Sequence, residues 1–245
     1  ISHLHGDHCF GLPGLIASFR LLGRDMPLHV YGPKGIKKMM ETIFTLTETH
    51  RGFEVIYHEL ESKDSEKIYE DNRVEVFTIP LDHRIYCNGY LFREKPKERH
   101  LNIEEVSKYP EIETCDYQNL KNGKDYILSD GYVLKNEILT NDPSKSVSYA
   151  FCSDTRYLET VIPIIENVDV LYHEATFLHE LKEMADYTGH TTALEAAQIA
   201  KKANVGKLIL GHFSNRYHDY SVFTDEARAI FPNTFLPKAL EPVKI

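Results

Sequence analysis

The sequence has no apolar run that approaches the roughly 20 residues of a membrane-spanning helix, so a transmembrane protein is not indicated. Cysteine pairs of the Cys-x-x-Cys type are also absent, because the four cysteines lie far apart at positions 9, 87, 115 and 152. This spacing indicates neither a disulfide framework nor a thiolate zinc site, and it favours a reducing compartment. There is no excess of positive charge either. The net charge of −9 argues against binding nucleic acid over the whole surface, although it permits a local site for phosphate.

Hydrophobic and charged residues occur in the proportions of an ordinary globular protein, 42% and 27% of the chain. The length of 245 residues suffices for one large α/β domain or for two smaller ones. Because apolar strand patterns alternate with helical patterns, we expect a layered α/β fold. Helices are predicted over residues 12–22, 34–49, 157–165 and 191–203, and strands over residues 27–31, 53–60, 73–79, 88–93, 146–151, 168–172 and 207–210.

Residues 95–145 differ in character from the rest of the chain. They are polar, rich in Lys and Glu, and short of large apolar clusters. One short helix over residues 101–106 and a small hairpin around Asp130-Gly131 are expected there. A segment of this length with little apolar core is typically a functional arm or lid, and the alternative is a solvated insertion without a role.

Three imidazoles and a carboxylate lie within the six residues His3-Leu4-His5-Gly6-Asp7-His8. In an extended backbone His3 and His5 point the same way, so both could bind one metal ion. Asp7 and His8 need a turn to converge, which Gly6 facilitates, and this pair could bind a second ion. Mixed nitrogen and oxygen ligands suit zinc or a similar metal. The alternative is a polar loop that is rich in His by chance.

Further polar residues stand at the ends of the later predicted strands. The ends of neighbouring strands along one edge of a sheet can gather side chains from distant parts of the sequence into one site. Each position is weak evidence alone, but together they extend the hexapeptide into a candidate centre. These residues are His83, Asp154, His173, Glu174 and His212.

The motifs of this chain resemble those of the metallo-β-lactamase superfamily, and within it those of the ribonuclease Z family of endonucleases, which mature the 3′ ends of tRNA. The resemblance runs in order from residue 1 to about residue 220. The motifs that carry it, besides the hexapeptide, are Leu81-Asp82-His83-Arg84-Ile85, Ser153-Asp154-Thr155, His173-Glu174-Ala175-Thr176-Phe177, Gly189-His190-Thr191-Thr192 and His212-Phe213-Ser214-Asn215-Arg216-Tyr217.

This resemblance implies a single αββα sandwich of the metallo-β-lactamase type over residues 1–245, with a protruding substrate-binding arm at residues 95–145. It also implies two zinc ions per subunit, which activate a water for attack on phosphorus. The implied ligands are His3, His5 and His83 for one ion and Asp7, His8 and His212 for the other, with Asp154 bridging both.

Catalytic roles follow from the same resemblance. Asp7 is the implied base, and His190 is the implied acid that protonates the leaving ribose oxygen, with Glu174 holding its other nitrogen. Ser214 and Arg216 are candidates for contacts with substrate phosphates. The alternatives are a helix-start role for His190, a buried structural pair for Glu174, and an ordinary surface turn for Ser214 and Arg216.

The implied activity is zinc-dependent removal of the 3′ trailer from precursor tRNA, which leaves a 3′ hydroxyl on the tRNA and a 5′ phosphate on the trailer. The resemblance also implies a cytoplasmic homodimer without membrane association. Two other functions stay open. One is a hydrolase of the same superfamily that acts on a small ester, thioester or phosphodiester, and the other is a metal-free binding subunit.

Two departures from the family pattern shape these expectations. The sequence begins at Ile1-Ser2-His3, inside the motif and without an initiator methionine, so we expect an N-terminal segment with the family's first strands to be missing. The stretch at residues 108–115 of the expected arm lacks the family's Gly-Pro-rich segment, and its charge is mixed instead of basic.

Overall fold

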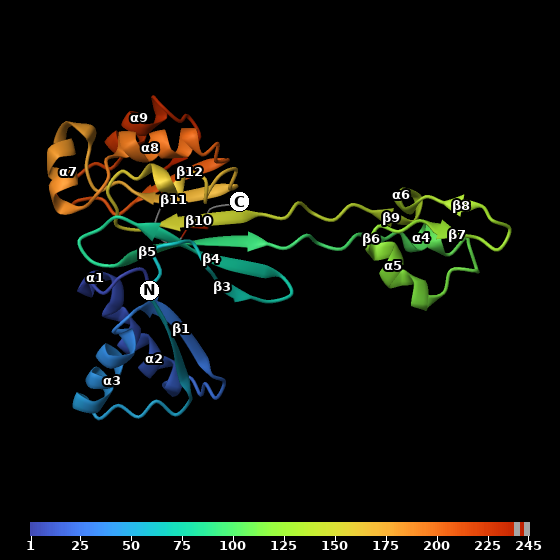
Figure 1. Cartoon of the computed structure of the whole chain (residues 1–245), viewed down its shortest axis with the longest axis horizontal. Helices are drawn as coiled ribbons and strands as arrows, with labels where there is room; N and C mark the ends of the chain where they lie inside the picture. Colours follow the sequence, from blue (N-terminus) through green and yellow to red (C-terminus); the bar gives the residue numbers. More distant parts are fainter. Residues whose placement is uncertain (238–240, 243–245) are drawn as a thin grey trace. The chain divides into compact units, whose positions relative to one another are not determined.

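The computed structural model of the chain describes residues 1–237 and 241–242 (Figure 1). The chain divides into two compact units. The main unit contains Ile1–Glu70, Glu75–Phe92 and the residues from Ser148 onwards, and the insertion unit contains Asp71–Val74 and Arg93–Val147. The expected arm at residues 95–145 therefore falls inside the insertion unit.

A mixed sheet of seven strands forms the centre of the main unit, in the order β13-β12-β11-β10-β5-β4-β3. Strands β10 to β13 pair in parallel, whereas β3 and β4 are antiparallel. Because β10, β11 and β12 run the same way, their C-terminal ends lie along one edge of the sheet. The strands are β3 Lys67–Glu70, β4 Val74–Leu81, β5 Cys87–Glu94, β10 Ser148–Cys152, β11 Val170–Glu174, β12 Lys207–Gly211 and β13 Thr234–Phe235.

Helices α8 (Ala193–Lys202) and α9 (Ser221–Arg228) lie against one face of this sheet (Figure 1), and α7 (Lys182–Thr188) precedes them. Alanine is small, so the buried alanine face of α8 can approach the strands closely. It shares one apolar core with Leu171 and Leu208 of the sheet. The fully buried alanines of α8 are Ala193, Ala196, Ala197 and Ala200.

A second, smaller sheet completes the main unit. Strand β1 (Leu28–Pro33) pairs in parallel with β2 (Val55–Leu60). Helix α1 (Gly6–Cys9) leads into α2 (Gly11–Leu21), and α3 (Ile36–Leu46) connects the two strands. A separate apolar core joins α2 and α3 to this sheet, so the main unit has two halves that each pack helices on a sheet. The buried residues of this core are Ile16, Val30, Ile36, Met40 and Phe44.

The insertion unit has a small core of its own, which the sequence does not predict. Its buried apolar residues are spread over residues 106–139 among polar ones, so the sequence shows no single apolar cluster. The core residues are Val106, Ile112, Leu120, Leu134 and Leu139. The elements are β6 His100–Leu101, α4 Ile103–Val106, α5 Tyr117–Lys121, β7 Tyr126–Ile127, β8 Val133–Leu134, α6 Asn136–Leu139, β9 Thr140–Asn141 and the 3₁₀ turn Thr114–Asp116.

One helix prediction is wrong. The expected helix over residues 157–165 is only a 3₁₀ turn at Glu159–Val161, because Pro163 lacks the amide hydrogen that a longer helix needs. The turn expected within the hexapeptide is observed as the helical turn Gly6–Cys9. Another 3₁₀ turn, His179–Leu181, precedes α7. Within the described residues, no helix combines the length and apolar character needed to cross a membrane.

Candidate metal centre

Four of the predicted site residues stand where strands of the large sheet end. His83 lies two residues beyond β4, and Asp154 lies two residues beyond β10. Glu174 is the last residue of β11, and His212 directly follows β12. Since β10, β11 and β12 are parallel neighbours, the last three residues meet at one edge of the sheet.

The backbone at His212 adopts a conformation that residues with a side chain rarely use, with φ of 62°. The preceding residue is Gly211, where a Cβ atom would lie only 2.2 Å from the hydroxyl oxygen of Tyr172. The chain therefore leaves the strand direction at the residue that carries the imidazole. Such conformations are found where the surrounding structure imposes them, often at functional sites.

The N-terminal hexapeptide supplies the other predicted ligands. His5 is the residue before helix α1, and the single turn of this helix carries Asp7 and His8. The amide of His8 donates to the carbonyl oxygen of His5 at 3.1 Å, which closes the turn. His3 precedes the turn and is fully buried.

One group of potential ligand atoms comes from His3, His5, His83 and Asp154, and all lie within 4.8 Å of one another. The Nε2 atom of His83 is 3.3 Å from Nδ1 of His5. The Oδ2 atom of Asp154 is 3.7 Å from Nε2 of His3 and 3.9 Å from Nε2 of His83. Three imidazoles and one carboxylate oxygen thus face a common point.

In a second group, the potential ligand atoms of Asp7, His8 and His212 also lie within 4.8 Å of one another. The Nε2 atom of His8 is 3.3 Å from Oδ2 of Asp7 and 3.4 Å from Oδ2 of Asp154. The Nε2 atom of His212 is 3.4 Å from Oδ1 of Asp154. Asp154 therefore lies between the two groups and presents an oxygen to residues of each.

The donor atoms of these groups fit divalent cations. The buried Nε2 atoms of His3 and His8 lie 3.3–3.7 Å from carboxylate oxygens, but neither makes a well-aligned hydrogen bond with a described residue, which is costly unless another group binds them. Burial, followed by the neighbouring His8, lowers the pKa of His3 to about 4, so this imidazole stays neutral, as a metal ligand must. Burial opposes ionisation of Asp154, but the imidazoles of His8 and His212 outweigh it and hold its pKa well below the usual range.

Contacts at the Nδ1 atoms of His83 and His3 orient these two imidazoles. The Nδ1 atom of His83 donates to the carbonyl oxygen of Gly189 at 2.8 Å. The Nδ1 atom of His3 lies 3.1 Å from the hydroxyl of Ser2. These contacts leave the Nε2 atoms of both rings directed toward the cluster. Such outer contacts fix the ring orientation and tautomer of metal-binding histidines.

Glu174 and His190 form a buried pair beside the cluster. The carboxylate of Glu174 is fully buried, and its Oε1 atom accepts from Nδ1 of His190 at 2.8 Å. Burial disfavours the charged imidazole, but the hydrogen bond and charge of Glu174 more than compensate, so the pKa of His190 is raised above its ordinary value. Potential ligand atoms of His190, Asp154 and His212 lie within 4.8 Å of one another. The dyad thus places a proton-carrying imidazole next to the two groups.

The remaining candidates lie in two different environments. Arg216 is exposed, its Nε donates to Ser214 Oγ at 3.1 Å, and its guanidinium lies 5.1 Å from the ring centre of Phe177. The amide of Ser214 donates to the carbonyl oxygen of Thr176 at 3.0 Å. His173 is almost fully buried and donates from Nδ1 to the carbonyl oxygen of Glu174 at 2.7 Å, outside both groups.

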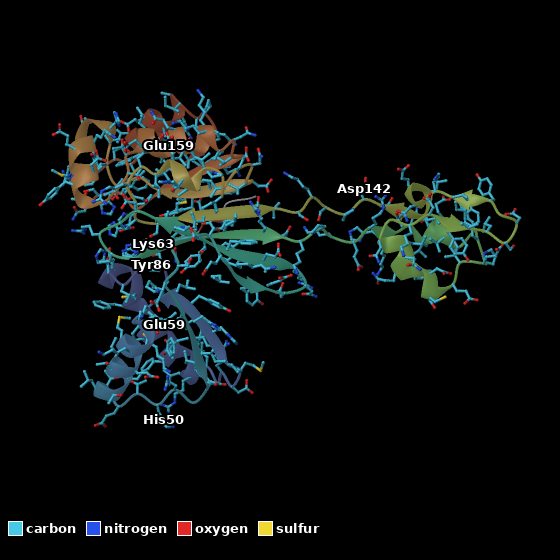
Figure 2. The ribbon with its side chains drawn as sticks, in the orientation of Figure 1. His50, Glu59, Lys63, Tyr86, Asp142 and Glu159 are labelled. Atoms are coloured by element: carbon cyan, nitrogen blue, oxygen red, sulfur yellow. The ribbon has the colours of Figure 1, made fainter. Side chains whose placement is uncertain are left out.

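A cavity of about 480 Å³ is lined in part by His83. The basic side chains of Lys63 and Arg84 line it as well, together with Asp82 and Tyr86. Figure 2 labels Lys63 and Tyr86, which lie side by side in the main unit. The cavity offers room and mixed charge next to a predicted ligand.

Sequence reasoning assigns no role to Gly189 or Thr176, although both lie inside the quoted motifs. Each contacts the Nδ1 atom of a predicted ligand. The carbonyl oxygen of Gly189 accepts from His83, and the hydroxyl of Thr176 lies 2.9 Å from Nδ1 of His212. Residue type alone does not reveal such a contact. The one available signal is Gly189, which follows α7 with φ of 83°, a typical left-handed helix end.

Several curated proteins are similar to this chain over nearly its whole length. It is 44% identical to the Ribonuclease Z of Bacteroides thetaiotaomicron, over 97% of this chain and 75% of that protein. It is 49% identical to the Ribonuclease Z of Cytophaga hutchinsonii, over 94% of this chain and 74% of that protein. No protein-family model matches the sequence.

Two solved structures resemble the fold. The short form of human tRNase Z matches with a TM-score of 0.66 and 22% identity, over 100% of this chain and 77% of that chain. A metallo-β-lactamase fold protein from Bacillus subtilis matches with a TM-score of 0.59 and 19% identity, over 96% of this chain and 71% of that chain. At these identities the likeness concerns the fold alone, and it confirms the expected metallo-β-lactamase type of α/β fold.

Proposed function

The chain belongs to the ribonuclease Z family, and from this membership we propose that it is a metal-dependent endonuclease that removes the 3′ trailer from precursor tRNA. The observation that carries this conclusion is the identity of 44% and 49% to proteins of that name over at least 94% of the chain. The geometry supports it, because every residue expected to bind metal lies in one of two adjoining groups.

The reaction is an in-line displacement at phosphorus. The oxygen of a water attacks the phosphorus atom at the cleavage point, and the bond from phosphorus to the ribose 3′ oxygen breaks. The tRNA keeps a 3′ hydroxyl and the trailer keeps a 5′ phosphate. The attacking water must lose a proton, and the leaving 3′ oxygen must gain one.

We propose two zinc ions as the cofactors. His3, His5 and His83 would hold one ion, Asp7, His8 and His212 would hold the other, and Asp154 would offer one oxygen to each. The Nε2 atoms of His3 and His8, which make no well-aligned hydrogen bond with a described residue, support this assignment. When bound, the two cations supply the Lewis acidity that activates the water and stabilises negative charge around phosphorus.

We assign proton transfer to two side chains, Asp7 and His190. Asp7 is exposed on α1, so it can orient the attacking water and accept its proton. His190 is held at Nδ1 by Glu174, so its Nε2 is free to donate a proton to the leaving 3′ oxygen. The raised pKa of His190 keeps more of this residue protonated near neutral pH, as an acid requires.

Contacts with the RNA backbone are assigned to Ser214 and Arg216. Both stand in the loop that follows His212, and the exposed guanidinium of Arg216 is steadied by the ring of Phe177. An arginine held in this way can donate two parallel hydrogen bonds to a phosphate. We propose that these residues contact a phosphate near the cleavage point.

The alternative of a hydrolase for a small ester, thioester or phosphodiester is not favoured, because the curated relatives are named Ribonuclease Z. If the protein were a metal-free binding subunit, the purified protein would retain less than one equivalent of zinc. Elemental analysis of the purified protein decides this point.

We also propose a homodimer in the cytoplasm, as in the family that the chain belongs to. Precursor tRNA is made in the cytoplasm of bacteria such as those that supply the curated relatives. All four cysteines are free, which is compatible with a reducing compartment. Light scattering of the purified protein measures the oligomeric state.

The decisive experiment maps the products of full-length protein acting on a precursor tRNA with a 3′ trailer. Wild-type protein should cut after the tRNA body, and Asp7→Ala should lower kcat by roughly 10²- to 10⁴-fold, because it removes a ligand and the base together. The matched control is Asp25→Ala, an exposed carboxylate in the loop before β1, which should leave kcat unchanged.

A chromogenic phosphodiester serves as the second substrate in the same assay. If wild-type protein turns over only this small ester, the assignment to tRNA is wrong. If Asp7→Ala retains full activity on the precursor tRNA, the role given to Asp7 is wrong even though the assignment stands.

A further inference from the structure

Thr176 lies between the two halves of the site. It follows β11 by two residues, and only 7% of its surface is exposed. Its Oγ1 atom is 2.8 Å from Oε2 of Glu174 and 2.9 Å from Nδ1 of His212. Its own amide also donates to Oε2 of Glu174 at 2.9 Å, and its carbonyl accepts from the amide of Ser214. The hydroxyl is therefore fixed between a carboxylate and a predicted metal ligand.

The hydrogen-bond partners of Glu174 determine which atoms donate in the series Glu174–Thr176–His212. Its Oε1 atom accepts from His190 and from the amides of Thr155 and Thr191, at 2.8, 3.1 and 3.2 Å. Both carboxylate oxygens thus act as acceptors. A threonine hydroxyl has one proton, so Thr176 donates it to Oε2 and has only lone pairs left for His212. The Nδ1 atom of His212 must then carry the proton of the neutral ring and donate it to Thr176.

We infer that Thr176 is a positioning residue that couples Glu174 to His212 and thereby presents the bare Nε2 atom of His212 for metal binding. The Nε2 atom faces Oδ1 of Asp154 at 3.4 Å, in the second group of ligands. The coupling matters because His212 has a left-handed backbone, so the strand does not fix its ring. Histidine ligands commonly depend on such a contact at the other ring nitrogen.

Glu174 consequently serves two rings with its two oxygens. Oε1 holds His190 directly, and Oε2 holds His212 through Thr176. The two imidazoles are stacked, with ring centres 5.3 Å apart and an angle of 27° between the planes. One buried carboxylate thus sets the orientation of both the proposed acid and a proposed ligand relative to each other.

The test removes the hydroxyl of Thr176 without changing the shape of the side chain. Thr176→Val loses the link, whereas Thr176→Ser keeps it. The matched control is Thr224→Val, which removes a buried hydroxyl that donates to the carbonyl oxygen of Ser221 in α9, twelve residues after the last predicted ligand. Zinc affinity is measured on full-length protein by competition with a chelator, and the tautomer of His212 is read from ¹⁵N chemical shifts of its ring.

Thr176→Val should weaken binding of one of the two zinc equivalents by about 10- to 100-fold, the usual effect of losing such a contact. It should also shift the His212 ring away from the Nδ1–H tautomer in the zinc-free protein. Thr176→Ser should restore both properties, and Thr224→Val should change neither. If the valine variant fails to fold, Thr176→Ala tests the same loss with a smaller side chain.

The inference rests on the proposed metal centre, but its readouts do not depend on tRNA cleavage. Wild-type affinity and an unchanged tautomer in the hydroxyl-free variants would overturn the role of Thr176 while leaving the proposed function intact. A wild-type protein that binds no zinc would overturn both. Equal losses in the valine and serine variants would show that packing, and not the hydroxyl, is what matters.

Discussion

The carbonyl oxygen of Gly189 accepts from Nδ1 of His83, and the same residue has a left-handed backbone with φ of 83°. A Cβ atom at this position would lie 2.9 Å from that nitrogen. Gly189→Ala should therefore displace His83 as well as strain the backbone by about 1–2 kcal/mol. We expect kcat on precursor tRNA to fall roughly 10- to 100-fold, as measured by single-turnover cleavage.

Gly23→Ala is the control for this variant. Gly23 also has a left-handed backbone, with φ of 78°, but a Cβ atom there would meet no atom within 4 Å. It should lose a similar amount of stability and keep its kcat. Equal losses of kcat in both variants would contradict a specific role of Gly189 in placing His83.

Buried His173 should make the free energy of unfolding depend on pH. Burial lowers the pKa of His173 below its ordinary value of 6.5, because the folded protein disfavours the charged ring. Below pH 6.5 the unfolded chain therefore takes up a proton that the folded chain refuses. The free energy of unfolding should fall with decreasing pH in this range, by up to about 1.4 kcal/mol per pH unit for this one residue.

His173→Asn should remove this part of the acid sensitivity, since an asparagine amide can still donate to the carbonyl oxygen of Glu174. Urea unfolding of metal-free protein at pH 7.5 and pH 5.5 measures the difference. The exposed His218 provides the control, and His218→Asn should keep the wild-type slope. A His173→Asn variant with an unchanged slope would refute the assignment.

At the scale of single residues, the sequence is informative where chemistry alone marks a side chain. The hexapeptide concentrates four potential ligands, and the strand-end positions add His83, Asp154 and His212, which the structure brings together. The hydrogen bonds behind these ligands could not be predicted in the same way. They depend on which backbone carbonyl or hydroxyl faces a ring nitrogen, as with Gly189 and Thr176, and common residue types carry no mark of such a role.

Helix α8 begins at Ala193, three residues after His190, so its N-terminal end helps to position this residue. Thr192 caps the helix and is fully buried, its hydroxyl accepts from the amide of Glu195, and the carboxylate of Glu195 accepts from the amide of Thr192. Thr192→Ala should lower the free energy of unfolding by about 1 kcal/mol, because this reciprocal cap loses one of its bonds. Chemical denaturation at a fixed zinc concentration measures the loss.

Thr192→Ser keeps the capping hydroxyl and should retain most of the stability. Thr42→Ala removes an exposed hydroxyl from the middle of α3, so it should change the free energy of unfolding by less than about 0.5 kcal/mol. A serine variant as unstable as the alanine variant would mean that the methyl group of Thr192, and not its cap, stabilises the helix.

At the scale of elements, periodicity predicts well where one face of an element is buried. Helix α8 is expected over residues 191–203 and observed at Ala193–Lys202, and β12 is expected over residues 207–210 and observed at Lys207–Gly211. Periodicity misleads where buried apolar residues have helical spacing but do not form a helix. Val161 and Ile165 are buried with helix-like spacing, but Pro163 prevents a helix between them. The short helices α7 and α9 are not predicted, because polar residues dominate both.

At the scale of the whole molecule, sequence patterns predict the fold class but not the apolar core of the insertion unit. Alternating strands and helices predict an α/β fold, and the large sheet with its covering helices confirms it. Residues 95–145 lie within the compact segment Arg93–Val147 of the insertion unit, and their role as a substrate-binding arm stays a prediction. The small core of this unit could not be predicted, because its five buried apolar residues are spread over residues 106–139 and become a cluster only through contacts between distant parts of the segment.

The insertion unit offers a test that separates binding from chemistry. Its apolar core shares no residue with the two cores of the main unit, so replacing residues 95–145 by a short Gly-Ser linker should leave the main unit folded. If this segment is the substrate-binding arm, the variant should bind precursor tRNA at least about 10-fold more weakly and still hydrolyse a small phosphodiester at the wild-type rate. Asp7→Ala should show the reverse pattern, because it damages the reacting groups and leaves the arm intact. Filter binding measures the first property and a chromogenic assay the second. A variant without the arm that loses both activities equally, while its zinc content and unfolding transition stay unchanged, would contradict the role assigned to residues 95–145.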